Sequence, residues 1–128
     1  MADEFESISD YATNILKLRL KLEDTQQHMT DEGIRDIQHL HDMVAEYIRM
    51  VAEAVEREDR TPEFFAEARA KGSAITRIMK DNRSKHLERV GQGIATPLKS
   101  LIYTDMLTSY RRIKDHAFNI AEVLIGEK

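Results

Sequence analysis

Two segments, one near each end of the chain, share a pattern of polar side chains that could do chemistry. The first, at residues 6–15, reads ESISDYATNI, and the second, at residues 111–122, reads RRIKDHAFNIAE. When Asp10 is aligned with Asp115, Asn14 falls on Asn119, and the apolar positions around them also agree. Together the segments supply carboxylate, amide, guanidinium and imidazole groups that could bind a cation or the charged tail of a partner: Glu6, Asp10, Asn14, Arg112, Asp115, His116 and Asn119.

The elements that must position these groups are helices, because the composition of the chain favours them. The 128 residues are enough for one domain with a hydrophobic core. Only two prolines and five glycines occur, whereas 33% of the residues are charged. Many of the others are alanine and leucine, and this composition favours helices over strands.

Apolar residues recur at spacings of three and four in successive stretches, which is the period of a helix buried on one face. The predicted helices span about residues 5–28, 31–58, 62–91 and 97–125. Short connections between them predict an all-α, antiparallel, up-down four-helix bundle. Three of the predicted apolar stripes matter below: Ile8, Tyr11, Ile15, Leu18, Leu22 and Met29; Ile34, Ile37, His41, Val44, Ile48, Val51 and Val55; and Ile102, Met106, Ser109, Ile113, His116, Ile120 and Val123.

Polar residues interrupt these stripes where an apolar side chain would give more stability: His41, Ser109 and His116. If the first and last helices are neighbours, the polar groups of the two similar segments face one another. Two interpretations then stay open. The groups could form a binding site, or they could form a buried polar layer in which Arg111 or Arg112 pairs with Asp10 or Asp115 and fixes the register of the helices.

Several classes of function are disfavoured by the composition. The chain has no cysteine, which excludes disulfides, thiolate nucleophiles and thiolate zinc sites. Its net charge is −4 and its basic residues alternate with acidic ones, so nucleic-acid binding is not expected. No apolar run approaches the roughly 20 residues of a membrane span, and the acidic N-terminus does not resemble a signal peptide. The chain is therefore expected to be soluble and cytoplasmic.

The segment RIKDHAFNIAE, at residues 112–122, resembles the signature on the third helix of each three-helix repeat in the phosphate-uptake regulator (PhoU) family. The stretch RSKHLERVGQG, at residues 83–93, is similar to the variant at the C-terminus of bacterial sodium/phosphate cotransporters. The resemblance covers essentially the whole chain. It implies that the first predicted helix is the third helix of one repeat and that the other three form a complete second repeat. Whether the chain is a fragment of a longer membrane transporter or a stand-alone relative stays open.

The resemblance implies a regulatory role in phosphate uptake, without catalysis, at the cytoplasmic face of the inner membrane. The implied partner is the membrane domain of a sodium/phosphate cotransporter, and a homo-oligomer is a further expectation. Contacts with a partner would then involve the polar residues of the last helix and their counterpart in the first: Asn14, Arg112, His116, Asn119 and Glu122.

The resemblance also implies a metal site. In relatives, acidic residues four positions apart bind metal ions, because carboxylates at i and i+4 lie on one helical face and can reach one hard cation. Glu6 and Asp10 keep this pair, and with Asp115 they are the predicted ligands of a divalent or iron-type ion. The second segment departs from the family pattern, since Arg111 stands where relatives usually carry a glutamate.

Two other classes of function compete with this one. A di-iron enzyme also uses a four-helix bundle, but it needs Glu-x-x-His pairs, and none occurs in the sequence, so no enzymatic activity is expected. A generic helical interaction module is the alternative. Phe64 and Phe65 could supply its contact surface, and the basic run from Lys80 to Arg89 could meet anionic headgroups of a membrane. Core filling and an ordinary solvated face explain the same residues as well.

Overall fold

The computed structural model describes residues 1–24 and 30–126 of the chain. Four helices make up most of these residues: α1 (Ala2–Asp24), α2 (Asp31–Arg57), α3 (Pro62–Gly91) and α4 (Pro97–Leu124). Within the described ranges no strand occurs, and no helix is apolar over a stretch long enough to cross a membrane. The prediction of an all-α fold with four helices is therefore confirmed.

Three of the helices begin where the sequence predicts, because a threonine caps each start. Oγ1 of Thr30 accepts a hydrogen bond from the backbone N–H of Gly33 at 3.0 Å, and Thr61 and Thr96 cap α3 and α4 in the same way. A proline occupies the first turn of both α3 and α4, where its missing N–H is not needed. Local capping chemistry thus fixes these boundaries.

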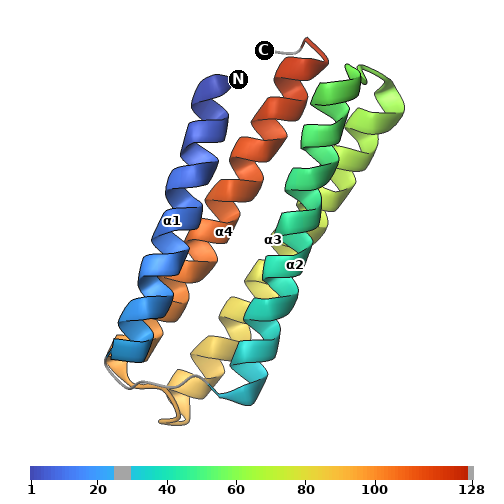
Figure 1. Cartoon of the computed structure of the whole chain (residues 1–128). Coiled ribbons are helices and arrows are strands. Elements are labelled where there is room, and N and C mark those ends of the chain that lie inside the picture. The colour runs from blue at the N-terminus through green and yellow to red at the C-terminus, as the bar shows by residue number, and fades with distance from the viewer. Residues whose placement is uncertain (25–29, 127–128) are drawn as a thin grey trace.

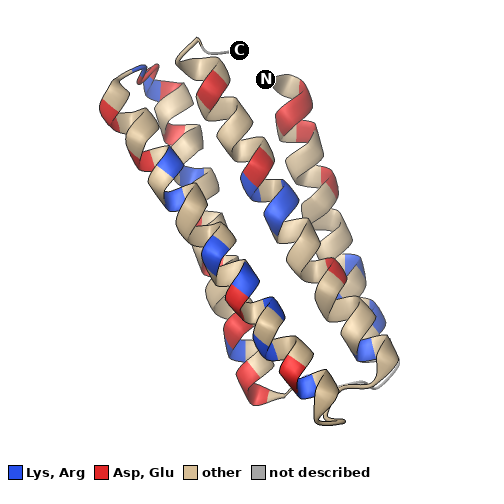
Figure 2. Cartoon of the chain, turned by 180° about the vertical axis from the view of Figure 1, so that it is seen from behind, with Lys and Arg blue, Asp and Glu red and all other residues tan. Residues whose placement is uncertain are grey.

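α1 differs from its prediction at both ends. It begins at Ala2 rather than near residue 5, and Asp3 and Glu4 place negative charge at the N-terminal end of the helix dipole. The structure describes α1 as far as Asp24, so Met29, the last residue of the predicted stripe, lies outside the described residues. Figure 2 shows acidic residues toward the N-terminal end of α1 and basic residues toward its other end.

The helices contact one another unequally. α4 contacts each of the other three helices, and α2 and α3 also contact each other, whereas α1 contacts only α4 within the described residues. Figure 1 shows α1 and α4 side by side, with the two chain termini at the same end of the bundle. We therefore distinguish a core unit, which consists of α2, α3 and α4, from α1, which is added to one side of α4.

Burial follows the same division. α4 has eleven buried residues. α1 contributes Ile8 and Leu22 to the buried core, and its Tyr11, Ile15 and Leu18 are only partly buried against that core. Because the hydrophobic contribution scales with the apolar area removed from water, the core unit supplies most of the stability.

The predicted stripe of α2 is displaced from the face that is actually buried. The structure buries Leu40 and Tyr47, which the stripe left out, whereas Ile34 is 44% exposed and His41 is exposed at the edge of the face. The reason is that α2 packs against both α3 and α4, so its buried face is wider than one stripe and is centred between two rows of side chains.

Candidate functional site

The two similar segments meet where α1 packs against α4. Nδ1 of His116 on α4 lies 2.5 Å from Oε2 of Glu4 on α1, and the side-chain amide of Asn119 donates to the same oxygen at 3.4 Å. The ring of Tyr11 stacks on the His116 ring, with 5.9 Å between the centroids. We name these four residues the histidine–glutamate cluster. The structure thus brings two of the predicted site residues together around an acid that was not predicted.

The position of Glu4 explains why it reaches α4. Glu4 precedes the buried Ile8 by four positions, so both side chains lie on the helical face that α1 turns toward α4. That spacing is the sequence signal by which Glu4 could have been found. The side chains of Glu4 and His116 are each 25% exposed, so their interaction is only partly shielded from water.

A second polar contact crosses the same interface farther along the bundle. The side-chain amide of Asn14 donates to Oγ of Ser109 at 2.9 Å, and Ser109 is 2% exposed. Asn14 follows Glu4 by about 15 Å along the helix axis, at 1.5 Å per residue. The two polar residues that interrupt the predicted stripe of α4, Ser109 and His116, therefore both have partners on α1. These contacts fix the register of α1 on α4.

The three predicted metal ligands are not gathered into one site. Glu6 and Asp10 are exposed on α1, whereas Asp115 pairs with Lys114 at 2.6 Å and with Arg111 at 3.9 Å on α4. In the part of the chain that the structure describes, no group of three or more His, Asp or Glu could hold a metal ion. Two exposed carboxylates are far fewer than the roughly six oxygen ligands of a calcium-type site, so the residues present do not fit one. The metal site stays a prediction of the resemblance.

The predicted polar layer takes a different form. Arg112 is exposed, and Arg111 pairs with Asp115 one turn away on its own helix rather than with Asp10 on α1. Glu122 is partly buried near the end of α4. Polar side-chain contacts that cross the interface include those of the histidine–glutamate cluster and the amide–hydroxyl contact described above. Arg111 does pair with Asp115, which is one of the expected combinations, but the pair lies within α4 and both side chains are 42% exposed, so it does not form a buried layer between the helices.

A second polar group is buried inside the core unit, at the end of the bundle opposite the chain termini. Asn82, His86 and Arg89 of α3 are 3%, 4% and 8% exposed. Nε2 of His86 lies 3.1 Å from Oγ of Ser100, and the His86 ring stacks on Tyr103 with 4.3 Å between the centroids. The guanidinium carbon of Arg89 lies 5.6 Å from the centroid of the same tyrosine ring. We name His86, Arg89 and Tyr103 the arginine–histidine cluster.

Burial and positive charge set the electrostatics of this cluster. Burial lowers the pKa of His86, and the charge of Arg89 lowers it further, so the imidazole is neutral at pH 7. Burial raises the pKa of the Tyr103 hydroxyl, while Arg89 acts in the opposite direction. Nη2 of Arg89 is buried and has no hydrogen-bond partner in the described part of the chain.

Sequence reasoning missed this cluster. The run from Lys80 to Arg89 is predicted to be a solvated or membrane-facing basic stretch, and this prediction is wrong for His86 and Arg89 because both are buried. The signal was the spacing: these two residues continue the buried stripe of Ile75 and Met79 at helical intervals. A basic residue at a position of an apolar helical stripe therefore predicts a buried charge.

The two clusters can do different chemistry. In the histidine–glutamate cluster, a carboxylate of α1 contacts an imidazole of α4, and this contact joins the two helices. In the second, a buried guanidinium is available to oxygen anions, for which its planar array of N–H donors is well suited.

Comparison with known proteins adds no further constraint on these assignments. No protein-family model, no curated protein and no solved structure matches the chain. The resemblance stated above therefore depends on residues 83–93 and 112–122 of the sequence itself.

Proposed function

We propose that this chain is a PhoU-like regulatory domain that modulates phosphate uptake by a membrane transporter and has no catalysis of its own. The observation that carries the proposal is the packing of α1. In the described residues α1 contacts only α4, and Tyr11 and Asn14 of its similar segment take part in these contacts. Such packing is what a helix from a preceding repeat would do beside a complete three-helix repeat.

The contacts at this interface support the same interpretation. A symmetric four-helix bundle would let every helix contact two neighbours, but here α4 is shared among three helices. If α1 and α4 are equivalent third helices of successive repeats, their similar sequences are expected to lie against each other. The stacking of Tyr11 on His116 is a contact of this kind, whereas the contacts of Glu4 with His116 and of Asn14 with Ser109 each join one segment to a residue just outside the other.

The exposed parts of the similar segments would face the transporter. Glu6 and Asp10 on α1 and Arg112 on α4 are exposed, so their charges are accessible to a partner. The proposed partner is the membrane domain of a sodium/phosphate cotransporter, approached from the cytoplasmic side. The proposal does not require a metal ion.

The test is phosphate uptake by cells whose sodium/phosphate cotransporter has lost its own cytoplasmic helical domain. This chain is fused to the C-terminus of the truncated transporter, and uptake is measured at low and high external phosphate. We expect the fusion to restore the dependence of uptake on external phosphate. The matched control carries Glu6→Lys and Asp10→Lys, which leave the α1–α4 contacts intact and should lose the effect. Unchanged uptake with a folded, expressed wild-type fusion would refute the proposal.

A second candidate function, a helical module that associates with a copy of itself, has its own observation. Leu16 and Leu20 of α1 are 60% and 52% exposed and lie one turn apart. The opposite charges at the two ends of α1 in Figure 2 would pair if two copies packed this helix in an antiparallel manner. Sedimentation equilibrium decides the matter: a dimer that Leu20→Glu dissociates supports this candidate, and a monomer at all concentrations rejects it.

A further inference from the structure

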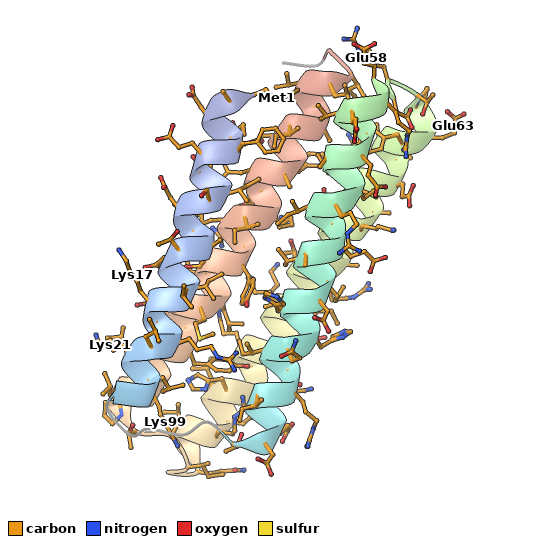
Figure 3. The ribbon with its side chains drawn as sticks, viewed as in Figure 1. Met1, Lys17, Lys21, Glu58, Glu63 and Lys99 are labelled. Atoms are coloured by element: carbon orange, nitrogen blue, oxygen red, sulfur yellow. The ribbon has the colours of Figure 1, made fainter. Side chains whose placement is uncertain are left out.

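A small cavity lies where the first turns of α2 and α4 approach the end of α3. Its lining includes Thr30 and Gly33 from the start of α2, Arg89 from α3, and Lys99 and Tyr103 from α4. Figure 3 labels Lys99 at the end of the bundle opposite Met1. The N-terminal ends of α2 and α4 therefore both lie beside this cavity. The N-terminal end of a helix carries a partial positive charge and backbone N–H groups that have no partner within the helix.

Arg89 is an independent indication that the cavity receives a negative charge. The residue is 8% exposed, and its Nη2 atom is buried with no hydrogen-bond partner among the described residues. No carboxylate within those residues forms an ion pair with it, although a buried charge is strongly disfavoured unless it is paired. The guanidinium therefore has the ring of Tyr103 beside it, 5.6 Å from its central carbon, and no carboxylate among the described residues within ion-pair distance; Oδ2 of Asp36 is likewise buried without a hydrogen-bond partner in these residues.

The guanidinium lies against the first turn of α2. A Cβ atom placed on Gly33 would lie 3.6 Å from Nη2 of Arg89 and 3.2 Å from Oγ1 of Thr30. The missing side chain of Gly33 therefore leaves space between the guanidinium and the capped start of the helix. This places Nη2 next to the partial positive charge of the α2 N-terminus, where an anion would be stabilised from two sides.

The charges around the cavity favour an anion. Arg89 and Lys99 are positive, and none of the residues that line the cavity is acidic. Glu32 and Asp36 are close enough to influence the Tyr103 hydroxyl, but neither lines the cavity. Nζ of Lys85 lies 3.7 Å from Oδ1 of Asp36, which partly neutralises that carboxylate.

We infer that this cavity binds a small inorganic oxyanion of the phosphate or sulfate type, with one oxygen accepting a hydrogen bond from Arg89. The cavity volume is about 20 Å³, which is room for about one oxygen-sized group, so the remainder of the anion occupies the open mouth beside Lys99. The inference does not depend on the proposed function, because it concerns residues of the core unit and needs no transporter.

The test compares thermal melts and titration calorimetry of the whole chain with sodium phosphate, sodium sulfate and sodium chloride at equal ionic strength. We expect phosphate and sulfate to raise the melting temperature in a saturable way and chloride to do so much less. Arg89→Gln removes the charged donor and should weaken oxyanion binding by about tenfold or more, while Lys99→Gln should weaken it by a smaller factor.

Lys80→Gln is the matched control, since it removes one positive charge from an exposed position on the same helix. It should leave oxyanion binding unchanged. If Arg89→Gln and Lys80→Gln respond to phosphate as the wild type does, the stabilisation is a general salt effect and the inference is wrong. If only Arg89→Gln loses the response, the relative affinities of the wild type for phosphate and sulfate identify which oxyanion the cavity prefers.

Two further measurements keep the test decisive if Arg89→Gln does not fold. In the wild type, amide NMR signals of Gly33 and Lys99 should shift and saturate as phosphate is added, and the absence of any shift there would overturn the inference. Asp36→Asn separates the remaining alternative, that Asp36 alone answers Arg89 at a distance. We expect this variant to bind oxyanion at least as well as the wild type. A large loss of stability in Asp36→Asn with no response to oxyanions would reject the site.

Discussion

The two histidine-centred clusters, at opposite ends of the molecule, differ in whether each charged side chain has a partner within the chain. At the α1–α4 interface, His116 lies 2.5 Å from the carboxylate of Glu4, and both side chains are 25% exposed. Inside the core unit, His86 lies beside Arg89, both are less than a tenth exposed, and Nη2 of Arg89 has no partner among the described residues. The first cluster is complete within the chain, whereas the second has a positive charge left over.

The difference comes from the elements that build each cluster. At the first, a separate helix brings its carboxylate to an imidazole of α4, so the two groups contact each other. At the second, the starts of α2 and α4 already contribute partial positive charge, and Arg89 and Lys99 add charge of the same sign. Charges of one sign that converge at helix N-termini point to a ligand, while a carboxylate in contact with an imidazole between two helices points to packing.

The largest expected effect separates the core unit from α1. Leu40 is 0% exposed in the core unit, so Leu40→Ala should lower the free energy of unfolding by about 2–5 kcal/mol. Leu18 of α1 is only partly buried, and Leu18→Ala should cost about 1–2 kcal/mol. Urea unfolding followed by circular dichroism measures both. Equal losses would show that α1 is as much a part of the core as α2.

The next effect is the pH dependence of stability, which should come from the buried His86 and not from the exposed His39. The pKa of His86 is lowered in the folded state, so the unfolded chain, with a histidine pKa of about 6.5, takes up the proton first. Stability should therefore fall as the pH drops through about 6.5 and stop falling below the folded pKa. Urea midpoints between neutral and mildly acidic pH measure this slope. It should shrink in His86→Gln and persist in His39→Gln, whose histidine is exposed; the same slope in all three would be contrary to expectation.

A smaller effect is expected at the histidine–glutamate cluster. Glu4→Gln keeps the shape of the side chain but removes the charge that answers His116, and should cost about 1 kcal/mol because the pair is partly exposed. Glu6→Gln is the matched control on the exposed side of α1 and should change stability by less than about 0.5 kcal/mol. Urea midpoints of the two variants give the comparison. If they agree, Glu4 makes no specific contribution.

The smallest effect concerns the contact between Asn14 and Ser109. Asn14→Ala removes the amide donor, but Asn14 is exposed, so water can replace part of the lost hydrogen bond. We expect a loss of about 0.5 kcal/mol at neutral pH. Chemical denaturation of this variant combined with Glu4→Gln should give nearly the sum of the two losses, because the sites are about 15 Å apart along α1. A strongly non-additive result would indicate that α1 docks as one rigid unit.

The sequence was informative about local structure and less so about contacts between helices. Three helix starts agree with the predicted ranges, and a threonine caps each of them, because capping needs only the residues of one turn. The similarity of the two segments also drew attention to the correct pair of helices. Yet Asn14, aligned with Asn119 in sequence, meets Ser109 in the structure. Antiparallel neighbours run their positions in opposite order, so residues that are equivalent in sequence need not face each other.

The partners of Glu4 and Arg89 could not be assigned from sequence for a related physical reason. A side chain's partner on another helix depends on helix rotation, which a single stripe does not determine when a helix packs against two neighbours. The same ambiguity displaced the predicted face of α2, where Leu40 and Tyr47 are buried and His41 is not. Whether a basic residue on such a face has an acidic partner depends on the positions of all the neighbouring helices.

The attachment of α1 to α4 alone also has a consequence for the timescale on which parts of the molecule open. A helix that rests on a single neighbour can separate from it without disturbing the packing of the remaining three. The backbone amides of α1 should therefore exchange with deuterium through local detachment, at a free energy well below that of global unfolding, whereas the central amides of α4 should exchange only when the whole core unit unfolds.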